Sequence, residues 1–295
     1  MQVLWSTAGD VFHNLALEDW WLDRFDAQGP VLLFYVNQPA IVVGKNQHPW
    51  REAAIGWARC EGVSIARRVS GGGAVYHDAG NLNFSLILPR GEYRQTDVFA
   101  QTIAALADQG IAAELRGGNS LYVCGKKVSG TAFCFRGGAA MHHGTLLVCS
   151  DLQRLRAALK PELPELETRA IPSKPAPVCN LADFRPELTM ASFAQALAAR
   201  LAGGAAPRAY EGPDDPRFHD RMGQHRSSAW VFGHTPSFSC NLPCGRLEVE
   251  RGCIARAIGP NVPATWIGLP FDPNGPWRDV LQKSPWADAP PRSSH

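Results

Sequence analysis

Three consecutive glycines, Gly71-Gly72-Gly73, constrain this chain of 295 residues more than any other feature. They stand between two runs that read as strands, Ser64–Arg67 and Asn83–Leu88. Consecutive glycines let a backbone pass very close to a bound molecule, or turn its N–H groups toward an anion. Arg67 and Arg68 precede them, and arginine holds a carboxylate or phosphate through forked hydrogen bonds. A flexible turn explains the glycines alone equally well, so their meaning depends on the rest of the sequence.

The glycine run differs from the two common nucleotide-binding loops. No Gly-Lys-Ser/Thr closes it as in a Walker loop, and the spacing Gly-x-Gly-x-x-Gly is absent. Two later segments carry residues suited to anion chemistry. Lys127 opens an expected strand of small residues, which places an ammonium within reach of a phosphate; an exposed hairpin lysine is the alternative. His142 and His143 point to opposite faces of a strand, so a shared metal is disfavoured and a structural pair is the alternative.

Composition excludes several classes of protein. Hydrophobic residues make up 45% and charged residues 19%, as in ordinary globular enzymes. The net charge of +2, without a Lys/Arg run, argues against a nucleic-acid partner. We find neither a signal peptide nor an apolar stretch of about 18 residues, so we expect a cytoplasmic protein with no membrane partner. The eight cysteines form no Cys-x-x-Cys pair, which predicts reduced thiols rather than zinc ligands.

The pattern of apolar residues predicts an α+β fold, a mixed β-sheet with flanking helices. Helices are expected at His13–Ala27, Phe99–Ala107, Leu152–Leu159 and Met190–Leu201. Strands are expected at Val31–Val36, Ile41–Val43, Leu121–Val123, Lys127–Phe135 and Leu146–Val148, in addition to the two that flank the glycines. We divide the chain into a large domain at 1–202, a linker at 203–226, a small C-terminal domain of three short strands at 227–286 and a disordered tail at 287–295. Proline-rich Pro161–Pro177 is expected to be an irregular crossing loop.

Three segments in a fixed order resemble the lipoate–protein ligase A family of the biotin and lipoate ligase superfamily. They are R-R-V-S-G-G-G-A-V-Y-H-D-A-G-N from Arg67 to Asn81, G-K-K-V-S-G-T-A from Gly125 to Ala132, and H-H-G-T-L-L from His142 to Leu147. The stretch Asn14–Glu18 resembles the opening helix of the family, and Pro236–Ser239 resembles the start of its small accessory domain. The resemblance therefore covers most of the chain. It implies a catalytic ligase-like domain followed by an accessory domain.

The resemblance implies a two-step reaction with ATP and Mg²⁺ as cofactors. Lipoate or octanoate attacks the α-phosphate of ATP to give an acyl-AMP. The acyl group then passes to a specific lysine of an apo lipoyl carrier protein, either H-protein-like or the lipoyl domain of an acyltransferase. Lys127 matches the essential lysine, whose charge would offset the negative charge that grows at the α-phosphate.

The resemblance also implies a set of substrate-binding residues. Those near the acyl and phosphate groups are Arg68, Ser70 and Gly73; those near the nucleotide are His77 and Asn81; those beside the acyl chain are Glu18, His143 and, at the dithiolane, Tyr35; Asn119, Ser129 and Ala132 complete the set. One position departs from the family. Its segment G-R-N-D reads G-G-N-S here, so Ser120 replaces the aspartate associated with magnesium. A hydroxyl is a poorer ligand for a hard cation, which leaves the metal site unknown.

Three alternatives remain open at this stage. A cysteine-dependent octanoyl or lipoyl transferase of the same fold would need a thiol beside the lysine, for which Cys124, Cys134, Cys149 and Cys179 are the candidates. A non-catalytic carrier-binding homologue is favoured by Ser120 and opposed by the retained Lys127. Biotin ligase is disfavoured because its G-R-G-R-x-G-R segment is absent. The sequence distinguishes neither lipoate from octanoate nor one carrier from another, and it does not give the oligomeric state.

Overall fold

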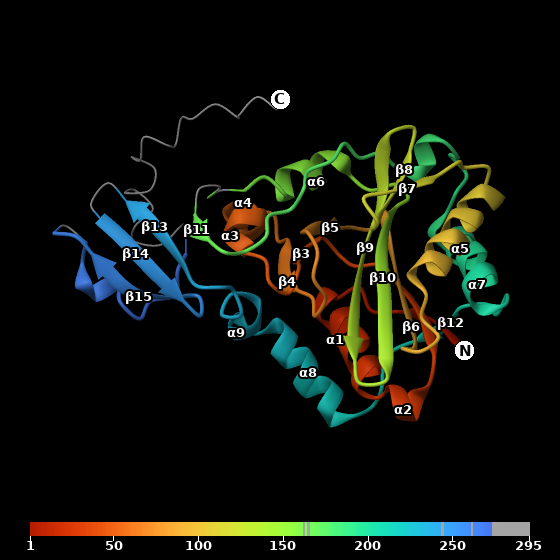
Figure 1. Ribbon diagram of the computed structural model, residues 1–295, viewed down its shortest axis with the longest axis horizontal. Coiled ribbons are helices and arrows are strands. Elements are labelled where there is room, and N and C mark those ends of the chain that lie inside the picture. The colour runs from red at the N-terminus through yellow and green to blue at the C-terminus, as the bar shows by residue number, and fades with distance from the viewer. Residues whose placement is uncertain (162, 164–165, 243–244, 261, 273–295) are drawn as a thin grey trace.

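A computed structural model describes residues 1–161, 163, 166–242, 245–260 and 262–272. Figure 1 shows a large unit around a long sheet and a small sheet at the other end of the long axis. The eight strands of the large sheet lie in the order β12 (Arg208–Tyr210), β1 (Gln2–Ser6), β2 (Val31–Tyr35), β6 (Asn81–Pro89), β10 (Ala139–Leu147), β9 (Lys126–Arg136), β8 (Ser120–Val123) and β7 (Glu114–Arg116). The first three are parallel and the remaining pairs antiparallel, so the predicted mixed sheet is confirmed.

Both faces of the large sheet are buried by helices. Helices α5 (Gln95–Asp108) and α7 (Met190–Ala202) contact each other and cover one face (Figure 1). Helix α1 (Val11–Asp23), followed by the short α2 (Phe25–Gln28), covers the other. Alternate residues of β2 enter the two cores, with Phe34 toward α5 and α7 and Leu33 toward α1. This double burial explains why β2 reads as an unbroken apolar run rather than an alternating one.

A second sheet of three strands supports the glycine run. It consists of β4 (Ser64–Arg67), β3 (Ala40–Val43) and β5 (Val75–His77), and it packs with helices α3 (Pro49–Glu52), α4 (Ile55–Cys60) and α6 (Leu152–Ala158). Strand β5 was not predicted, because three residues directly after a glycine run give too short a pattern. Gly44, at the end of β3, is required by a close approach: a Cβ there would lie 2.2 Å from the carbonyl oxygen of Gly72.

The predicted hairpin at Cys124-Gly125 is confirmed. Both residues have positive φ, 47° and 75°, as a two-residue turn between antiparallel strands requires. Strand β10 begins seven residues before the predicted Leu146–Val148 run. The first part of β10 contains histidine and glycine and therefore lacks the apolar pattern that predicts a strand. Backbone hydrogen bonds to β6 on one side and β9 on the other stabilise it as a strand. Pairing with the neighbouring strands therefore determines where β10 begins, which the local sequence did not indicate.

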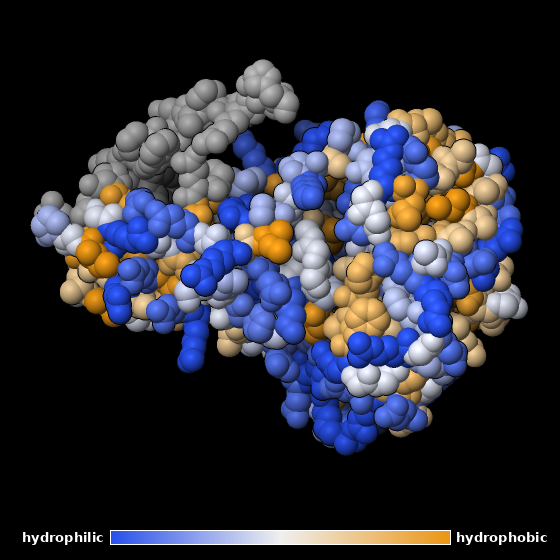
Figure 2. Space-filling model, viewed as in Figure 1, coloured by the Kyte–Doolittle hydropathy of each residue, from blue (hydrophilic) through white to orange (hydrophobic). Residues whose placement is uncertain are grey.

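The residues predicted as a linker, 203–226, are built onto the large unit. Strand β12 extends the large sheet beside β1, and helix α8 (Pro216–Arg226) packs against α1. Asp19 of α1 accepts hydrogen bonds from Arg136 at 2.6 Å and Arg221 at 2.7 Å. Against the effect of burial, the hydrogen bond with His225 and then the charges of these arginines hold the pKa of that carboxyl well below its usual range. The surface over α8 is largely hydrophilic (Figure 2). The domain boundaries themselves remain a prediction.

The C-terminal sheet shares a hydrophobic core with the large unit. After α9 (Ser228–Val231), strands β13 (Phe238–Leu242), β14 (Gly245–Glu250) and β15 (Cys253–Ile258) form the expected meander, β11 (Glu167–Thr168) from the crossing loop adds an edge strand, and a 3-10 turn follows at Ala264–Trp266. Trp50 of α3 lies 5.4 Å from Phe238 and 5.2 Å from Phe271, measured between ring centroids. The predicted tail at 287–295 lies outside the described residues. Among those described, no helix is both long and apolar enough to cross a membrane.

Arg67 links the two parts through a buried guanidinium that bonds backbone carbonyls and one hydroxyl. It donates to the carbonyl oxygen of Val231 at 2.6 and 2.9 Å and to Thr235 Oγ1 at 2.8 Å. Both residues belong to the connector, residues 231–237, which leads from the end of α9 to β13. It also donates to the carbonyl oxygens of Gly44, Lys45 and Gln47. Burial lowers the pKa of Arg67 to about 10, so the charge is kept. This side chain fixes the connector to the loop that leads from β3.

Candidate active site

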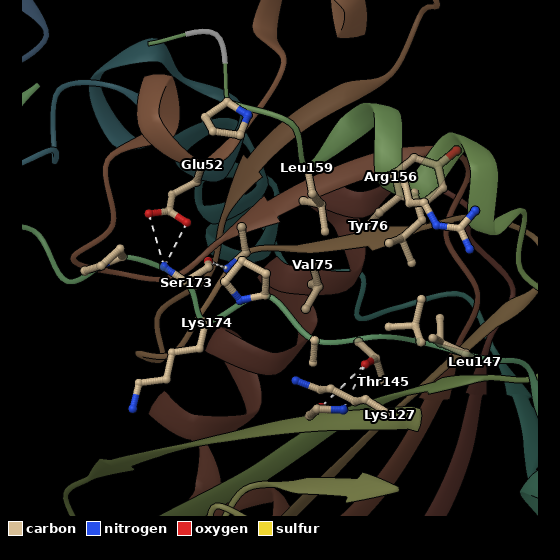
Figure 3. Close-up of a pocket in the computed structure, with 18 of the residues that line it drawn as sticks. Glu52, Val75, Tyr76, Lys127, Thr145, Leu147, Arg156, Leu159, Ser173 and Lys174 are labelled. Carbon is tan, nitrogen blue, oxygen red and sulfur yellow. Dashed lines mark hydrogen bonds between the residues drawn. The ribbon is translucent and has the colours of Figure 1, made fainter. Parts of the chain in front are cut away.

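Two cavities meet at Lys127. The first has a volume of about 620 Å³ and the second about 490 Å³. Their shared wall consists of Ala74, Val75, Lys127, Gly130, Thr145, Pro172, Ser173 and Lys174. Figure 3 shows the first cavity, with Lys127 beside Thr145 on one side and Tyr76 and Leu159 across from them. A ligand in one cavity is therefore brought next to a ligand in the other at the ammonium of Lys127.

The surroundings of Lys127 keep its ammonium free. Its backbone N–H donates to the carbonyl of Pro177 at 2.8 Å, and its carbonyl accepts from Cys179 at 3.2 Å, so the crossing loop fixes the start of β9. Gly130 leaves room for the side chain, because a Cβ there would lie 3.1 Å from Lys127 Cε and Nζ. Burial and the charge of Arg68 lower the pKa of Lys127. Within the described residues no carboxylate pairs with it, so the ammonium is available to an anionic ligand.

The crossing loop forms a wall of both cavities. Ser173 Oγ accepts hydrogen bonds from Gln47 Nε2 at 3.0 Å and from the N–H of Ala74 at 2.9 Å. The N–H of Ser173 donates to the Glu52 carboxylate at 3.0 Å (Figure 3). These bonds tie an irregular segment to the glycine run and to α3. Sequence reasoning identified the loop only by its prolines and missed Ser173, Lys174, Gln47 and Glu52, for which no local pattern gives a signal.

A buried chain of polar side chains runs behind the second cavity. Tyr35 OH donates to Glu18 Oε1 at 2.9 Å, and His143 Nδ1 lies 2.9 Å from Glu18 Oε2. His143 Nε2 is 2.6 Å from Ser70 Oγ, which also accepts from Arg68 Nε at 3.0 Å. The His143 ring therefore lies between the Glu18 carboxylate and the Ser70 hydroxyl. Helix α1, strand β2, strand β10 and the glycine run are thereby connected through one network.

Arg68 shapes the glycine run directly. Its Nη2 donates to the carbonyl oxygens of Gly71 at 2.6 Å and Gly73 at 2.8 Å. Gly72 between them has φ of 90°, a conformation that favours glycine. Burial lowers the pKa of Arg68 to about 10, with the charge of Glu18 opposing the shift, so the guanidinium stays protonated. The forked bonding expected toward an anion is directed at the loop in this structure.

The structure brings most of the predicted substrate-binding residues to the second cavity. Those that line it are Tyr35, Arg68, Gly73, His77, Asn119, Ala132 and His143, while Ser129 lines the first cavity and Lys127 lines both. Glu18 and Ser70 stand behind the wall and act through His143 and Arg68. Asn81 lines neither cavity; its Nδ2 donates to Asn83 Oδ1 at 3.0 Å. His77, which the resemblance places near the nucleotide, shares the second cavity with His143.

The residues at the expected magnesium position do not fit a protein-bound divalent cation. Ser120 lines the second cavity, and its hydroxyl donates to Asn119 Oδ1 at 3.1 Å. Among the described residues, no carboxylate lines that cavity and no group of three His, Cys, Asp or Glu side chains is placed to bind a metal. In the first cavity the carboxylate of Glu52 is already bound to Ser173. Hard divalent cations prefer carboxylate oxygens, and the lining offers none that is free.

The candidate nucleophilic cysteines lie away from the cavities. In the part of the chain that the structure describes, no cysteine lines either one. Cys179 is buried in the core under α7, and burial raises the pKa of its thiol. Burial also raises the pKa of Cys134, and Cys124 is exposed in the hairpin turn. Cys149 lines a separate surface hollow beside Asp78. A cysteine-dependent mechanism thus finds no activated thiol at Lys127.

Comparison with known proteins agrees with this arrangement. The model of the lipoyl protein ligase A/B catalytic domain matches residues 10–202. A lipoate-protein ligase A from Psychrobacter cryohalolentis is 34% identical over 256 residues, which are 82% of this chain and 75% of that protein. P. falciparum LipL1, solved in complex with lipoate, superposes with a TM-score of 0.71 at 25% identity over 86% of this chain and 82% of that one. A lipoate-protein ligase A bound with ATP shares the fold, with a TM-score of 0.61 at 24% identity over 76% and 94% of the two chains. The chain, with its lysine between two cavities, therefore belongs to the lipoate–protein ligase family of enzymes, the lipoyl protein ligase A/B group.

Proposed function

We propose that this enzyme activates lipoate or octanoate with ATP and transfers the acyl group to a lysine of a lipoyl carrier protein. The meeting of two cavities at Lys127 is the observation that supports it best. The first cavity is named the nucleotide cavity and the second the acyl cavity below. Both volumes fall within the range of about 300–1,000 Å³ that is usual for small-molecule sites.

The nucleotide cavity is suited to a base and sugar. Its apolar lining includes Val75, Leu147, Leu155, Leu159 and Val178, with Tyr76 beside them. Apolar and aromatic walls with few polar groups are typical of sites for flat heterocycles. Lys127 and Lys174 stand where this cavity joins the acyl cavity. The phosphates of ATP would therefore lie toward the two lysines.

In the first step, a carboxylate oxygen of the acid attacks the α-phosphorus of ATP, an oxygen–phosphorus bond forms, and pyrophosphate leaves. Negative charge grows on the phosphate oxygens during this step. The ammonium of Lys127, partly removed from water and free of a carboxylate partner among the described residues, stabilises that charge. In the second step the neutral amine of the carrier lysine attacks the acyl carbonyl, an amide forms and AMP leaves.

Magnesium enters this proposal only as the family's expected companion of ATP. Asn119 and Ser120 offer no charged oxygen to a metal ion. Lys127 and Lys174 bring positive charge to the place where the two cavities join. The carrier we propose is an apo lipoyl domain, either H-protein-like or from an acyltransferase. We expect the reaction in the cytoplasm, where the thiols, free in the described part of the chain, stay reduced.

The test is acyl transfer to a panel of apo lipoyl carriers, with and without ATP and magnesium, followed by intact-mass measurement of the carrier. We expect transfer that depends strictly on ATP, together with an acyl-AMP when the carrier is omitted. Transfer from an acylated carrier without ATP, blocked by iodoacetamide, would replace the proposal with a cysteine-dependent transferase. Absence of any adenylate and any transfer would leave a carrier-binding homologue.

A further inference from the structure

Lys174 of the crossing loop places a second ammonium where the two cavities join. Within the part of the chain that the structure describes, Lys127 and Lys174 are the charged residues that line both cavities. Lys127 belongs to strand β9 and burial lowers its pKa, whereas Lys174 is exposed. No carboxylate pairs with either ammonium among the described residues. The junction therefore carries two unpaired positive charges, one partly buried and one exposed to solvent.

The backbone around Lys174 is held in place. Ser173, which precedes it, accepts a hydrogen bond from the N–H of Ala74 at 2.9 Å, and its own N–H donates to the Glu52 carboxylate at 3.0 Å. Pro175 follows, and a proline restricts the residue before it to extended conformations. The Lys174 side chain extends away from Glu52 (Figure 3). A loop that is fixed in advance loses little freedom when an anion binds to it.

The arginines that line the cavities do not serve the junction. Arg68 donates to carbonyl oxygens of the glycine run, Arg51 to a carbonyl oxygen of the crossing loop, and Arg116 to a neighbouring carboxylate. Arg156 of α6 lines the nucleotide cavity on the opposite side from Lys174 (Figure 3). Among the described residues, Lys174 is therefore the cation beside Lys127 that an anionic ligand can still use.

The chemistry of the first step requires a second cation near Lys127. Under the proposed function, the attacking carboxylate comes from the acyl cavity and the α-phosphate lies at Lys127. The leaving group of a phosphoryl transfer departs roughly in line with the attacking oxygen and on the opposite side. Pyrophosphate therefore moves away from the acyl cavity with several negative charges, and it must reach solvent. Lys174 stands at the exposed edge of the junction, and lysine is a common ligand of phosphate groups.

We propose that Lys174 holds the β- and γ-phosphates of ATP and the departing pyrophosphate, while Lys127 stays with the α-phosphate. The bond from the carboxylate oxygen to the α-phosphorus forms, and the bond from the α-phosphorus to the bridging oxygen breaks. Its electron pair stays on pyrophosphate, whose charge Lys174 offsets. The inference rests on the proposed function and deepens it. It assigns Lys174 to the first step alone, because the second step releases AMP after pyrophosphate has gone.

The first test measures binding rather than activity. Calorimetry compares inorganic pyrophosphate and AMP, each with magnesium, on the full chain without the acid. Lys174→Met keeps the length of the side chain and removes its charge, and we expect pyrophosphate to bind about tenfold more weakly, the size of one charge-assisted hydrogen bond. AMP should bind within about twofold of the wild type, since its phosphate lies at Lys127. Lys174→Arg keeps the charge and should keep most of the affinity for pyrophosphate.

A matched control and the contrary results complete the binding test. Lys160→Met removes another exposed lysine, one that lines neither cavity, and it should change neither affinity. An unchanged affinity of Lys174→Met for pyrophosphate overturns the inference. So does an equal loss for pyrophosphate and AMP, and so does a wild type that binds no pyrophosphate.

The second test separates the two steps in single turnovers. Acyl-AMP formation from ATP and lipoate should slow about tenfold in Lys174→Met at ATP concentrations below KM. Transfer from purified acyl-AMP to the carrier should slow far less. Equal slowing of both steps would place Lys174 at the acyl-AMP and overturn the assignment. The proposed function fails on a different result, the absence of any acyl-AMP from the wild type with ATP and either acid.

Discussion

Ser70 Oγ lies 2.6 Å from His143 Nε2 and so joins the glycine run to the buried Glu18 network. The same oxygen accepts from Arg68 at 3.0 Å, so two buried groups depend on it. Ser70→Ala removes the partner of His143 Nε2 and leaves Arg68 Nε only the carbonyl oxygen of Gly71. It should lower the free energy of unfolding by about 1–3 kcal/mol, measured by urea denaturation. Ser85→Ala is the matched control, because Ser85 Oγ is buried with no hydrogen-bond partner in the described part of the chain, and its removal should be neutral or stabilising. Equal effects of the two changes would contradict the network.

Lys127→Ala should abolish adenylate formation while the fold survives. Among the described residues, Lys127 and Lys174 are the charged side chains that line both cavities. Removal of a charge that stabilises a transition state typically costs about a hundredfold or more in rate. Pyrophosphate release measures the step, and the thermal transition checks the fold. The adjacent Lys126→Ala is the control, because that side chain is exposed and lines neither cavity. Wild-type pyrophosphate release by Lys127→Ala would contradict the assigned role.

Gly130→Ala should impair the enzyme by moving Lys127 rather than by unfolding. The new Cβ would lie 3.1 Å from Cε and Nζ of that lysine, and the flexible side chain would move aside. We expect kcat for adenylation to fall about tenfold with little change in melting temperature. Gly223→Ala in α8 is the control, since nothing lies within 4 Å of its Cβ and alanine favours a helix. A large loss of stability in Gly130→Ala would show that the strand, not the lysine, needs the glycine.

Acid should weaken the core that joins the C-terminal sheet to the large unit. His48 is fully buried against Trp50 and Phe238, neither ring nitrogen has a partner among the described residues, and burial lowers its pKa to about 3. Below its ordinary value of 6.5, the unfolded state takes up a proton that the folded state refuses. Stability is therefore fully present above that pH and falls as pH decreases toward 3, by about 2 kcal/mol at pH 5 from this residue.

The measurement is the difference in unfolding free energy between pH 7.5 and pH 5. In His48→Leu this difference should shrink by about 2 kcal/mol, because the buried titrating group is gone. His219→Leu, which replaces an exposed histidine, should leave the difference as in the wild type. An unchanged acid sensitivity in His48→Leu would mean that this ring is not a source of it.

Arg67→Met should loosen the connector to the C-terminal sheet. The change leaves the buried carbonyl oxygens of Val231, Gly44 and Gln47 without their donor, which we expect to cost about 3 kcal/mol or more. Limited proteolysis near 232–237 and urea denaturation report it. Arg59→Met is the control, because it removes an exposed arginine paired with Asp272 and should change stability by less than about 1 kcal/mol. Equal protease resistance of the wild type and Arg67→Met would contradict the link.

The sequence predicted the elements whose apolar pattern is strong and missed those that neighbours impose. Strand β2 and helix α7 follow from their own residues, and the turn at Cys124-Gly125 follows from glycine. Strand β12, within the predicted linker, forms because β1 offers an unpaired edge. The sequence motifs predicted that Lys127, Arg68 and His143 belong to one site, and all three line the acyl cavity. Ser173 entered it only through long-range bonds to Gln47 and Ala74, which no local spacing reveals.

Arg67 is the last residue of β4 and Arg68 follows it, and their guanidiniums bond to different segments on opposite sides of the backbone. One holds the connector of the C-terminal sheet, and the other holds the carbonyls of the glycine run. The peptide unit between these two residues therefore joins the support of the C-terminal sheet to the shape of the wall of the acyl cavity. A substitution that shifts this unit would disturb both at once.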